Sequence, residues 1–445
     1  MNELLKPNQM IKSGVGQPCK VIKFLGSGGQ GEVYQVEWGG REFALKWYYQ
    51  QNATPDQREL LLRLVSEGKP SDKFLWPEDL AFADRVPGYG YIMRLRPPEY
   101  KSLNDLVAGK IQPTYIALIT AALELVKAFR SLHIKGLAYR DISFGNAFFN
   151  PATGDVLICD NDNVATNRMA NPCGVLGTPD FMAPEIVRGE AQPTNKTDLH
   201  SLSVLLFYIF CMGHPLMGKK VSNIRCWDAP ARTKIFGEEP VFIFDPNDRS
   251  NEALDKSHDP TGETGGWALV YWQMYPKLLR DTFLKSFTVG LRDPDCRVTE
   301  LEWSNALAAL RDAVFKCVCS TPNFYDSETA KYPGGSQALC WHCKQPLKYP
   351  FRIRIGKSVV MLNADSKLYL HHMADGHDYD FATPVAEVTR HPSDPNIWGL
   401  KNISGTKWVV TLPNGTLKDV EPGRSAPLAS NTKIAFGKVD GEIRY

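Results

Sequence analysis

Three oxygen-bearing side chains in the first half of the chain have the types and the spacing that phosphoryl transfer requires. Asp141 and Asn146 lie in one short polar segment, and Asp160 follows the apolar run from Val156 to Ile158. In such a set, one carboxylate orients an attacking hydroxyl and takes its proton, while a carboxylate and an amide hold Mg²⁺ against the phosphates. Asp and Asn are also common turn residues, so the set acquires meaning only from the elements that position it.

Two elements flank this set in the sequence. The apolar stretch from Ala117 to Leu132 predicts a helix before it, and Val156 to Ile158 predicts a short strand that ends next to Asp160. The three side chains would therefore lie on loops at the ends of neighbouring elements.

The bulk composition is that of an ordinary globular protein. Of 445 residues, 43% are hydrophobic and 22% are charged, with a net charge of +2 and no long basic run. This composition argues against disorder and against a nucleic-acid partner. The polar N-terminus (1–17) lacks a secretory h-region, and the longest apolar run (202–212) is too short to span a bilayer. We expect a cytoplasmic protein of two or three domains without a membrane partner.

A glycine-rich segment follows the expected strand Val21–Leu25. Gly26, Gly28 and Gly31 keep a G-x-G-x-x-G spacing, which lets backbone amides approach phosphates closely. In a dinucleotide-binding fold a helix would follow, whereas Val33–Trp38 is strand-like. The segment therefore favours a glycine-rich hairpin over a dinucleotide site.

Lys46 ends the next apolar strand, after Phe43 to Leu45. A lysine at such a position is commonly an edge residue whose stem covers apolar surface, but its distance from the glycine loop favours a phosphate-binding role. A helix is expected from Pro55 to Glu67, with proline in its first turn.

Together these segments resemble protein kinases. Tyr139–Asn146 resembles their catalytic loop, Gly177–Glu185 the segment that closes their activation loop, and Asp293–Thr299 a late kinase motif. The motifs keep the kinase order over about residues 15–316. The resemblance implies an α+β, bilobal protein kinase fold, with a β-rich N-lobe at 15–96 and a helical C-lobe at 97–316.

The resemblance also implies roles for individual residues. Asp141 would be the catalytic base, Asn146 and Asp160 the Mg²⁺ ligands, and Thr178 the residue that orients Asp141. Residues expected to bind ATP are Gly26, Ser27, Gly28, Gly29, Gly31, Val33, Ala44, Lys46 and the gatekeeper Met93.

Three ion pairs or anchors follow from the same resemblance. Glu59 is expected to pair with Lys46, in preference to Glu67, which abuts Gly68 at the helix end. Asp198 is expected to steady the catalytic loop. Arg297 is expected to meet Glu185. Arg140 is retained and would receive a phosphate from the activation loop, with Thr166 and Thr178 as candidate sites.

Some positions depart from the kinase pattern. Ser143 stands where Ser/Thr kinases usually place a lysine, which removes a positive charge near the γ-phosphate. Asn161 and Asp162 replace the usual Phe and Gly, and we interpret Asp162 as a turn residue rather than a second metal ligand. These departures keep a nucleotide-binding pseudokinase scaffold as the alternative. The Gly177–Glu185 segment favours protein substrates over small molecules.

A stretch rich in Gly, Pro and Asp with several aromatic residues runs from Phe236 to Tyr275. We expect it to form a large loop insertion that packs on the helical lobe.

Four late cysteines form two close pairs, Cys317 with Cys319 and Cys340 with Cys343. Paired thiolates on short turns suit tetrahedral Zn²⁺, so a structural zinc knuckle is predicted at 317–349, with His342 as a reserve ligand. The alternatives are disulfides, which are rare in the cytosol, and four unrelated thiols.

Residues 350–445 alternate apolar and polar positions between turn signals, which is typical of an all-β sandwich. The succession of Trp398–Asn402, Trp408, Gly415–Thr416 and Pro427–Leu428 in this tail resembles a divergent forkhead-associated domain. That resemblance implies phosphothreonine binding, while a plain protein-docking sandwich remains the alternative. His371, His372 and His377 with Asp375, Asp378 and Asp380 are interpreted as a solvated loop rather than a metal site.

The succession of kinase, cysteine knuckle and β domain resembles the bacterial eukaryotic-like Ser/Thr kinases of tellurite-resistance-type clusters. That resemblance implies protein substrates, with a von Willebrand A protein and a PP2C-type phosphatase as partners. We predict ATP- and Mg²⁺-dependent transfer of the γ-phosphoryl group to Ser/Thr hydroxyls, including autophosphorylation.

Overall fold

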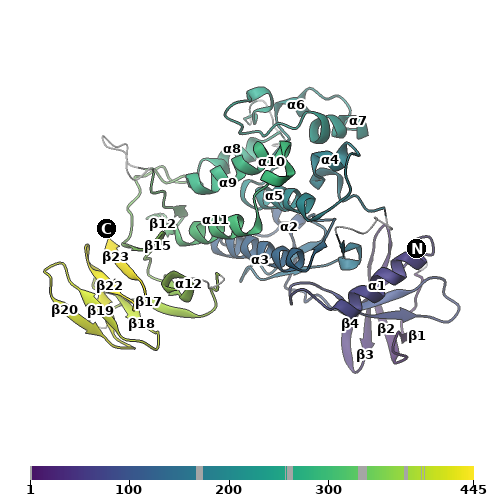
Figure 1. Cartoon of the computed structure of the whole chain (residues 1–445), viewed down its shortest axis with the longest axis horizontal. Coiled ribbons are helices and arrows are strands. Elements are labelled where there is room, and N and C mark those ends of the chain that lie inside the picture. The colour runs from purple at the N-terminus through teal and green to yellow at the C-terminus, as the bar shows by residue number, and fades with distance from the viewer. Residues whose placement is uncertain are drawn as a thin grey trace. The chain divides into compact units, whose positions relative to one another are not determined.

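The chain folds into two compact structural units (Figure 1). A computed structural model describes residues 3–166, 174–255, 257, 264–328, 338–374, 379–391, 393–394 and 396–445. The first unit combines residues 1–271 with 283–301, and the second combines 272–282 with 302–445. The first therefore holds the predicted catalytic segments, and the second holds the cysteine pairs and the β-rich tail.

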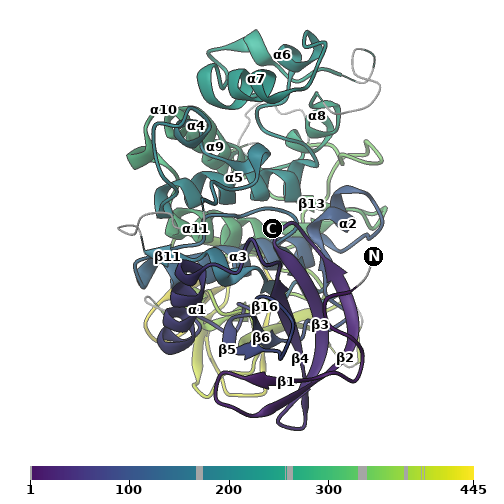
Figure 2. The ribbon, with the colours of Figure 1, turned by 90° about the vertical axis from the view of Figure 1, so that its right-hand side faces the viewer.

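Six strands of the first unit close into a barrel in the order β1-β2-β3-β4-β6-β5 (Figure 2). The barrel closes because β1 pairs with both β2 and β5. Its interior is filled by large apolar side chains, among them Tyr34, Leu45 and Trp47. The strands are β1 (Met10–Ser13), β2 (Pro18–Ser27), β3 (Gly31–Trp38), β4 (Arg41–Tyr48), β5 (Pro77–Phe82) and β6 (Gly90–Arg94).

Helix α1 (Pro55–Glu67) packs against β5 and has the predicted bounds. The side chain of Thr54 caps its first turn by accepting a hydrogen bond from the Gln57 amide. The buried residues are Gln57, Leu60, Leu61 and Leu64, an i, i+3, i+4, i+7 stripe that places one face of the helix against the barrel.

Helices dominate the rest of the first unit. The longest, α3 and α5, lie against each other (Figure 1) and are apolar over most of their surface, as expected of buried helices. The helices that lie wholly in this unit are α2 (Leu103–Val107), α3 (Tyr115–Ile134), α4 (Pro184–Val187), α5 (Asn195–Cys211), α6 (Lys219–Ser222), α7 (Ala229–Arg232) and α10 (Val289–Arg292). Three further helices are divided between the two units: α8 (Gly266–Trp272), α9 (Lys277–Phe287) and α11 (Glu300–Asp312).

Short strands and single helical turns carry the catalytic segments. Strand β9 pairs with β10 and β7, and β8 pairs with β11. These elements are β7 (Lys101–Ser102), β8 (Leu137–Ala138), β9 (Ala147–Phe149), β10 (Val156–Ile158), the turn η1 (Asn161–Asn163), β11 (Ala165–Thr166) and the turn η2 (Pro179–Phe181).

The expected insertion at about 236–275 packs onto the helical lobe through its aromatic residues. Phe242 is fully buried, and its ring lies 5.6 Å from that of Phe207 and 5.3 Å from that of Phe287. The described part contains a wide helical turn, η3 (Thr233–Glu238), and the short turn η4 (Arg249–Asn251). A later turn, η5 (Pro294–Cys296), precedes Arg297.

The second unit ends in two facing β-sheets that enclose a common apolar core around Trp408, Ile353 and Leu400. The six-stranded sheet has the order β15-β14-β23-β22-β19-β20, and the four-stranded sheet the order β16-β17-β18-β21. Two facing sheets with a shared core make the expected sandwich. Its elements are β14 (Arg352–Ile355), β15 (Ser358–Met361), β16 (Lys367–Tyr369), α12 (Leu370–Met373), β17 (Pro384–Arg390), β18 (Trp398–Asn402), β19 (Trp408–Thr411), β20 (Leu417–Val420), β21 (Ser425–Pro427), β22 (Lys433–Ala435) and β23 (Asp440–Arg444).

The division between the units differs from the predicted boundary at 316/317. A hairpin of β12 (Val314–Lys316) and β13 (Pro322–Phe324) belongs with residues 272–282. The ring of Tyr275 lies 5.2 Å from that of Phe324, and the Lys277 amide donates to Asp326. Packing of this earlier segment on the hairpin therefore moves the boundary upstream.

Within the described part of the chain, the helices all lack the combination of length and apolar character that crossing a membrane requires.

Candidate active site

A cleft of about 990 Å³ brings together the predicted nucleotide-binding residues. Strands β2, β3, β4 and β6 form one side, and the segments after β8 and β10 form the other. Its lining includes Gly26, Ser27, Gly28, Gly29, Gly31, Val33, Ala44, Lys46, Met93, Asp141 and Asp160. A concave site of this size with a few polar side chains is large enough for a nucleotide.

Gly31 allows the glycine-rich hairpin to lie close to strand β4. A Cβ atom at Gly31 would stand 2.1 Å from the carbonyl oxygen of Trp47. Around Gly26, Gly28 and Gly29, in contrast, a Cβ atom would meet no other atom within 4 Å and would project into open space. The hairpin therefore exposes backbone to the cleft, which suits contact with phosphate groups.

Asp141 is held from two sides. Thr178 Oγ1 donates a 2.8 Å hydrogen bond to Asp141 Oδ1, and Asn146 Nδ2 donates a 3.0 Å bond to Asp141 Oδ2. Burial raises the pKa of the Asp141 carboxyl, and the hydrogen bonds from Thr178 and Asn146 offset part of that rise. A carboxylate fixed in this way can orient a hydroxyl group and accept its proton.

The backbone of the catalytic loop is anchored by Asp198, as predicted. The Asp198 carboxylate accepts hydrogen bonds from the amides of Tyr139 (2.6 Å) and Arg140 (2.9 Å). His133 Nε2 lies 3.1 Å from the same carboxylate. Arg140 adopts a φ of 74°, a left-handed conformation that costs energy for a non-glycine residue and persists because these bonds fix it.

Asn146 and Asp160 lie at the same end of the β9–β10 hairpin. Ala147 pairs with Ile158, and the Cys159 amide donates to the Asn146 carbonyl at 2.9 Å. Because Asn146 Nδ2 donates to Asp141, the acceptor oxygen Oδ1 is the atom that a metal ion would use. A carboxylate and an amide oxygen on adjacent strand ends match the donors that Mg²⁺ prefers.

The predicted pairing of Glu59 with Lys46 is wrong. The Glu59 side chain is exposed to solvent. Lys46 Nζ instead lies 2.8 Å from Asp162 Oδ2, 2.8 Å from Gln30 Oε1 and 3.5 Å from Asp160 Oδ1. Asp162 lies in the turn η1, as expected, but its side chain is fully buried and pairs with Lys46, which the sequence did not indicate.

The helical period of α1 explains why Glu59 does not reach Lys46. The buried face of the helix carries Leu60, Leu61 and Leu64, and the residue one turn before them on the same face is Gln57, not Glu59. Gln57 Nε2 donates to the Asp162 carbonyl at 2.9 Å and to Tyr48 OH at 3.2 Å. The apolar stripe could have predicted that Gln57 faces inward. No pattern in the sequence indicated that Asp162 would pair with Lys46 in place of a carboxylate on the helix.

Asn161 stands where kinases usually have a phenylalanine, and it makes polar contacts at that position. Its side chain is fully buried, and Nδ2 donates to the carbonyls of Leu75 at 2.9 Å and Ile158 at 3.1 Å. The turn after β10 is thus tied to the N-lobe by hydrogen bonds. Ser143 is buried as well.

The segment after the catalytic loop is anchored at its far end. Arg297 Nη1 and Nη2 each donate a 2.8 Å bond to the Glu185 carboxylate, which confirms the predicted pair. Arg140 Nη2 donates to the Thr166 carbonyl at 3.1 Å. Residues 167–173, which lie in the sequence between the candidate phosphorylation sites Thr166 and Thr178, are outside the described residues.

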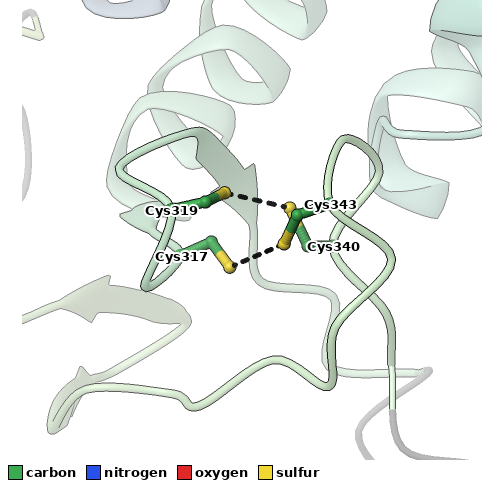
Figure 3. A group of neighbouring side chains, drawn as sticks. All are labelled: Cys317, Cys319, Cys340 and Cys343. Carbon is green, nitrogen blue, oxygen red and sulfur yellow. Dashed lines mark hydrogen bonds between the residues drawn. The ribbon is translucent and has the colours of Figure 1, made fainter.

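The four predicted cysteines converge in the second unit (Figure 3). Cys317 and Cys319 lie on the turn between β12 and β13, and Cys340 and Cys343 lie on a second turn. Sulfur–sulfur distances are 3.7 Å for Cys317–Cys343 and 3.8 Å for Cys319–Cys340. A tetrahedral zinc ion with Zn–S bonds of about 2.3 Å requires sulfurs about 3.8 Å apart, so the four thiols fit this metal.

The histidine-rich segment differs from its interpretation as a solvated loop. His372 is buried, with Nε2 3.0 Å from Asp312 Oδ2 and Nδ1 accepting from the Tyr369 amide. Asp375, His377 and Asp378 lie outside the described residues. Both ring nitrogens of His372 are thus used in packing α12 within the second unit.

Comparisons with known proteins agree with this geometry. Residues 19–255, more than half of the chain, match the family described as protein kinase domain. The DNA damage-responsive serine/threonine-protein kinase RqkA of Deinococcus radiodurans is 31% identical over 221 residues, which is 46% of this chain and 31% of that protein. The serine/threonine-protein kinase PknD of Chlamydia pneumoniae is 24% identical over 305 residues, covering 56% of this chain. The chain spans only 32% of the length of PknD.

Proposed function

The chain belongs to the protein kinase family, and from this premise we propose that it is an active kinase that phosphorylates Ser and Thr hydroxyls of proteins. The observation that carries the proposal is the fixed Asp141 carboxylate at the edge of the cleft, held by Thr178 and Asn146. Thr178 lies in the Gly177–Glu185 segment, whose pattern is that of kinases with protein substrates.

The residues of the cleft have distinct roles in this proposal. Asp141 orients the substrate hydroxyl and accepts its proton, while the glycine-rich hairpin and Lys46 hold the phosphates. Asn146 and Asp160 supply the oxygen donors for Mg²⁺, which neutralises charge on the phosphates when it is bound. Burial lowers the pKa of Lys46, but the neighbouring carboxylates outweigh this effect and raise the pKa, so the side chain remains a cation.

Autophosphorylation with labelled ATP and Mg²⁺ tests the proposal, with wild type compared with Asp141→Ala. Loss of the general base is expected to lower the rate by about 10²–10⁴-fold. Nucleotide should still raise the melting temperature of the variant, because Asp141 is not among the residues assigned to hold the nucleotide. Equal labelling in both proteins would contradict the role of Asp141. No labelling in either, with nucleotide still bound, would favour the pseudokinase scaffold.

We also propose that Cys317, Cys319, Cys340 and Cys343 hold a structural Zn²⁺ ion. The sulfur–sulfur distances support it, and Trp341 Nε1 donates to the Pro322 carbonyl at 2.7 Å, which ties the two cysteine turns together. Metal analysis of purified protein should give about one zinc per chain, as a Cys₄ site requires. Folded protein without zinc would refute the site.

The remaining proposals concern partners and location. We propose that the β-sandwich at 350–445 docks proteins. Its likeness to a forkhead-associated domain supports phosphothreonine as the ligand. A von Willebrand A protein and a PP2C-type phosphatase are the partners that the sequence resemblance supports. A cytoplasmic location fits the described cysteines, all of which are free thiols. Binding measurements between the purified proteins test the partners.

A further inference from the structure

Lys46 meets its main carboxylate in the turn after β10 rather than on helix α1. Its ammonium group is buried in the wall of the cleft, 2.8 Å from Asp162 Oδ2 and 3.5 Å from Asp160 Oδ1. A further contact, with Gln30 Oε1 at 2.8 Å, comes from the glycine-rich hairpin. Asp160 and Asp162 belong to one turn, so a single segment supplies both negative charges around this lysine.

The two carboxylates differ in what they can reach. The Asp160 side chain is 41% exposed and lines the cleft. The Asp162 side chain is 0% exposed and is absent from the cleft lining. In this arrangement Asp162 is therefore out of reach of a nucleotide in the cleft, and the charged group that it contacts is Lys46.

A buried network holds Asp162 in place. Tyr48 OH donates to Asp162 Oδ2, Gln57 Nε2 donates to the Asp162 carbonyl at 2.9 Å, and the same Nε2 donates to Tyr48 OH at 3.2 Å. Helix α1 thus contributes the neutral side-chain amide of Gln57, which bonds to the backbone of Asp162, whereas the negative charge that pairs with Lys46 lies in the turn after β10. A buried lysine needs a charged, hydrogen-bonded partner to remain an ordered cation.

We propose that Asp162 is the positioning residue for Lys46, replacing the helix carboxylate that was expected at Glu59. The orientation of the phosphate-binding lysine is then tied to the turn that carries Asp160, and it does not depend on a charge on α1. This inference rests on the proposed kinase function for its effect on rate, but not for its effect on Lys46 itself.

The first test measures Lys46 directly and needs no phosphoryl transfer. The rate at which a small amine-reactive ester acylates Lys46 is followed by mass spectrometry at one fixed pH in the full chain. In wild type, the 2.8 Å pair with Asp162 should hold the buried Lys46 ammonium in the wall of the cleft and keep it slow to react. In Asp162→Asn the reaction should become at least about tenfold faster, because a buried charge that loses its partner no longer stays in one position.

The second test uses activity. Asp162→Asn should lower kcat/KM for ATP by about 100-fold, a loss typical of removing one preorganised electrostatic contact. One control variant accompanies it. Glu59→Gln changes the exposed residue that the structure removes from the site, and its Lys46 should be acylated at the wild-type rate.

The outcomes separate the two proposals. If Asp162→Asn lowers the melting temperature but leaves Lys46 acylation unchanged, Asp162 has only a structural role and the inference fails. The inference also fails if wild-type Lys46 reacts like a free lysine, a result that can be obtained even if the variant does not fold. If wild type transfers no phosphate while Asp162→Asn accelerates acylation, the proposed function fails and the inference stands.

Discussion

In the kinase unit, the side chains of the cleft come from distant segments, and Lys46 meets Asp162 across 116 positions of sequence. In the C-terminal unit, the sulfurs that face each other are only 21 and 26 positions apart, on two short turns. The cleft groups are held by other protein groups, as Asp141 is by Thr178 and Asn146. The four sulfurs lie mainly against one another, apart from a 3.4 Å hydrogen bond that Asn323 Nδ2 donates to Cys340 Sγ, and a thiol is a weak hydrogen-bond donor. The cleft groups are therefore held by the fold, whereas the cysteine centre would be held by the Zn²⁺ ion that we propose for it.

The largest expected effect concerns the zinc ion that we propose for the cysteine centre. In Cys340→Ser, zinc binding should weaken severely, because structural zinc contributes about 10–16 kcal/mol in small cysteine modules. Metal content and proteolysis of residues 317–349 measure the loss. Cys226→Ser, at an exposed cysteine outside the cluster, is the control and should keep its zinc. If Cys340→Ser kept full zinc and the same protease resistance, the contrast between the two regions would disappear.

A smaller effect is expected from the buried ion pair of the kinase unit. Arg297→Ala leaves the Glu185 carboxylate without its two 2.8 Å bonds, and breaking a buried pair in this way costs about 3–5 kcal/mol. Denaturant unfolding measures the change. In Arg63→Ala, which removes an exposed pair with Glu67, the change should stay within about 0.5 kcal/mol. Equal losses of unfolding free energy in the two variants would show that burial does not determine how much an ion pair stabilises this unit.

His133 should make the stability of the kinase unit depend on pH. Burial alone would lower the pKa of His133, but hydrogen bonds with Asp198 and Glu300 raise it to about 9. Because the pKa is raised by folding, protonated His133 stabilises the folded state fully below pH 6.5, the ordinary pKa of histidine, and this stabilisation is lost as pH rises through 9. The loss in the free energy of unfolding is about 3 kcal/mol.

Unfolding of wild type and His133→Gln between pH 6 and 9.5 measures this dependence. The variant should be less stable at pH 6 and should lose less stability as pH rises. Parallel curves for the two proteins would remove His133 as the titrating group.

The smallest expected effect concerns the orientation of Asp141. Thr178→Val removes the 2.8 Å hydrogen bond to Oδ1 while keeping the shape of the side chain. We expect kcat to fall by about 10–100-fold, because misorientation of one catalytic group costs a rate factor of this size. KM for ATP should hardly change, since Thr178 does not line the cleft. A rise in KM with an unchanged kcat would place Thr178 in nucleotide binding instead.

Much of this organisation could be predicted from local sequence. Thr54 and the apolar stripe of α1 determine a helix from Pro55 to Glu67, because capping and periodicity act within a few residues. The order of the kinase-like segments predicted the contacts of Thr178 with Asp141, Asp198 with the catalytic loop and Arg297 with Glu185. The spacing of the four cysteines predicted their convergence.

Only the tertiary structure decided which carboxylate meets Lys46. The stripe of α1 turns Gln57 inward and Glu59 outward, which the sequence contained, but no local pattern distinguishes Asp162 from a turn residue. Its burial depends on how the turn after β10 packs under strand β4 and helix α1, through Tyr48 and Gln57. A buried charge is tolerated only where the whole fold brings an opposite charge to it, so this pairing is a property of the assembled molecule.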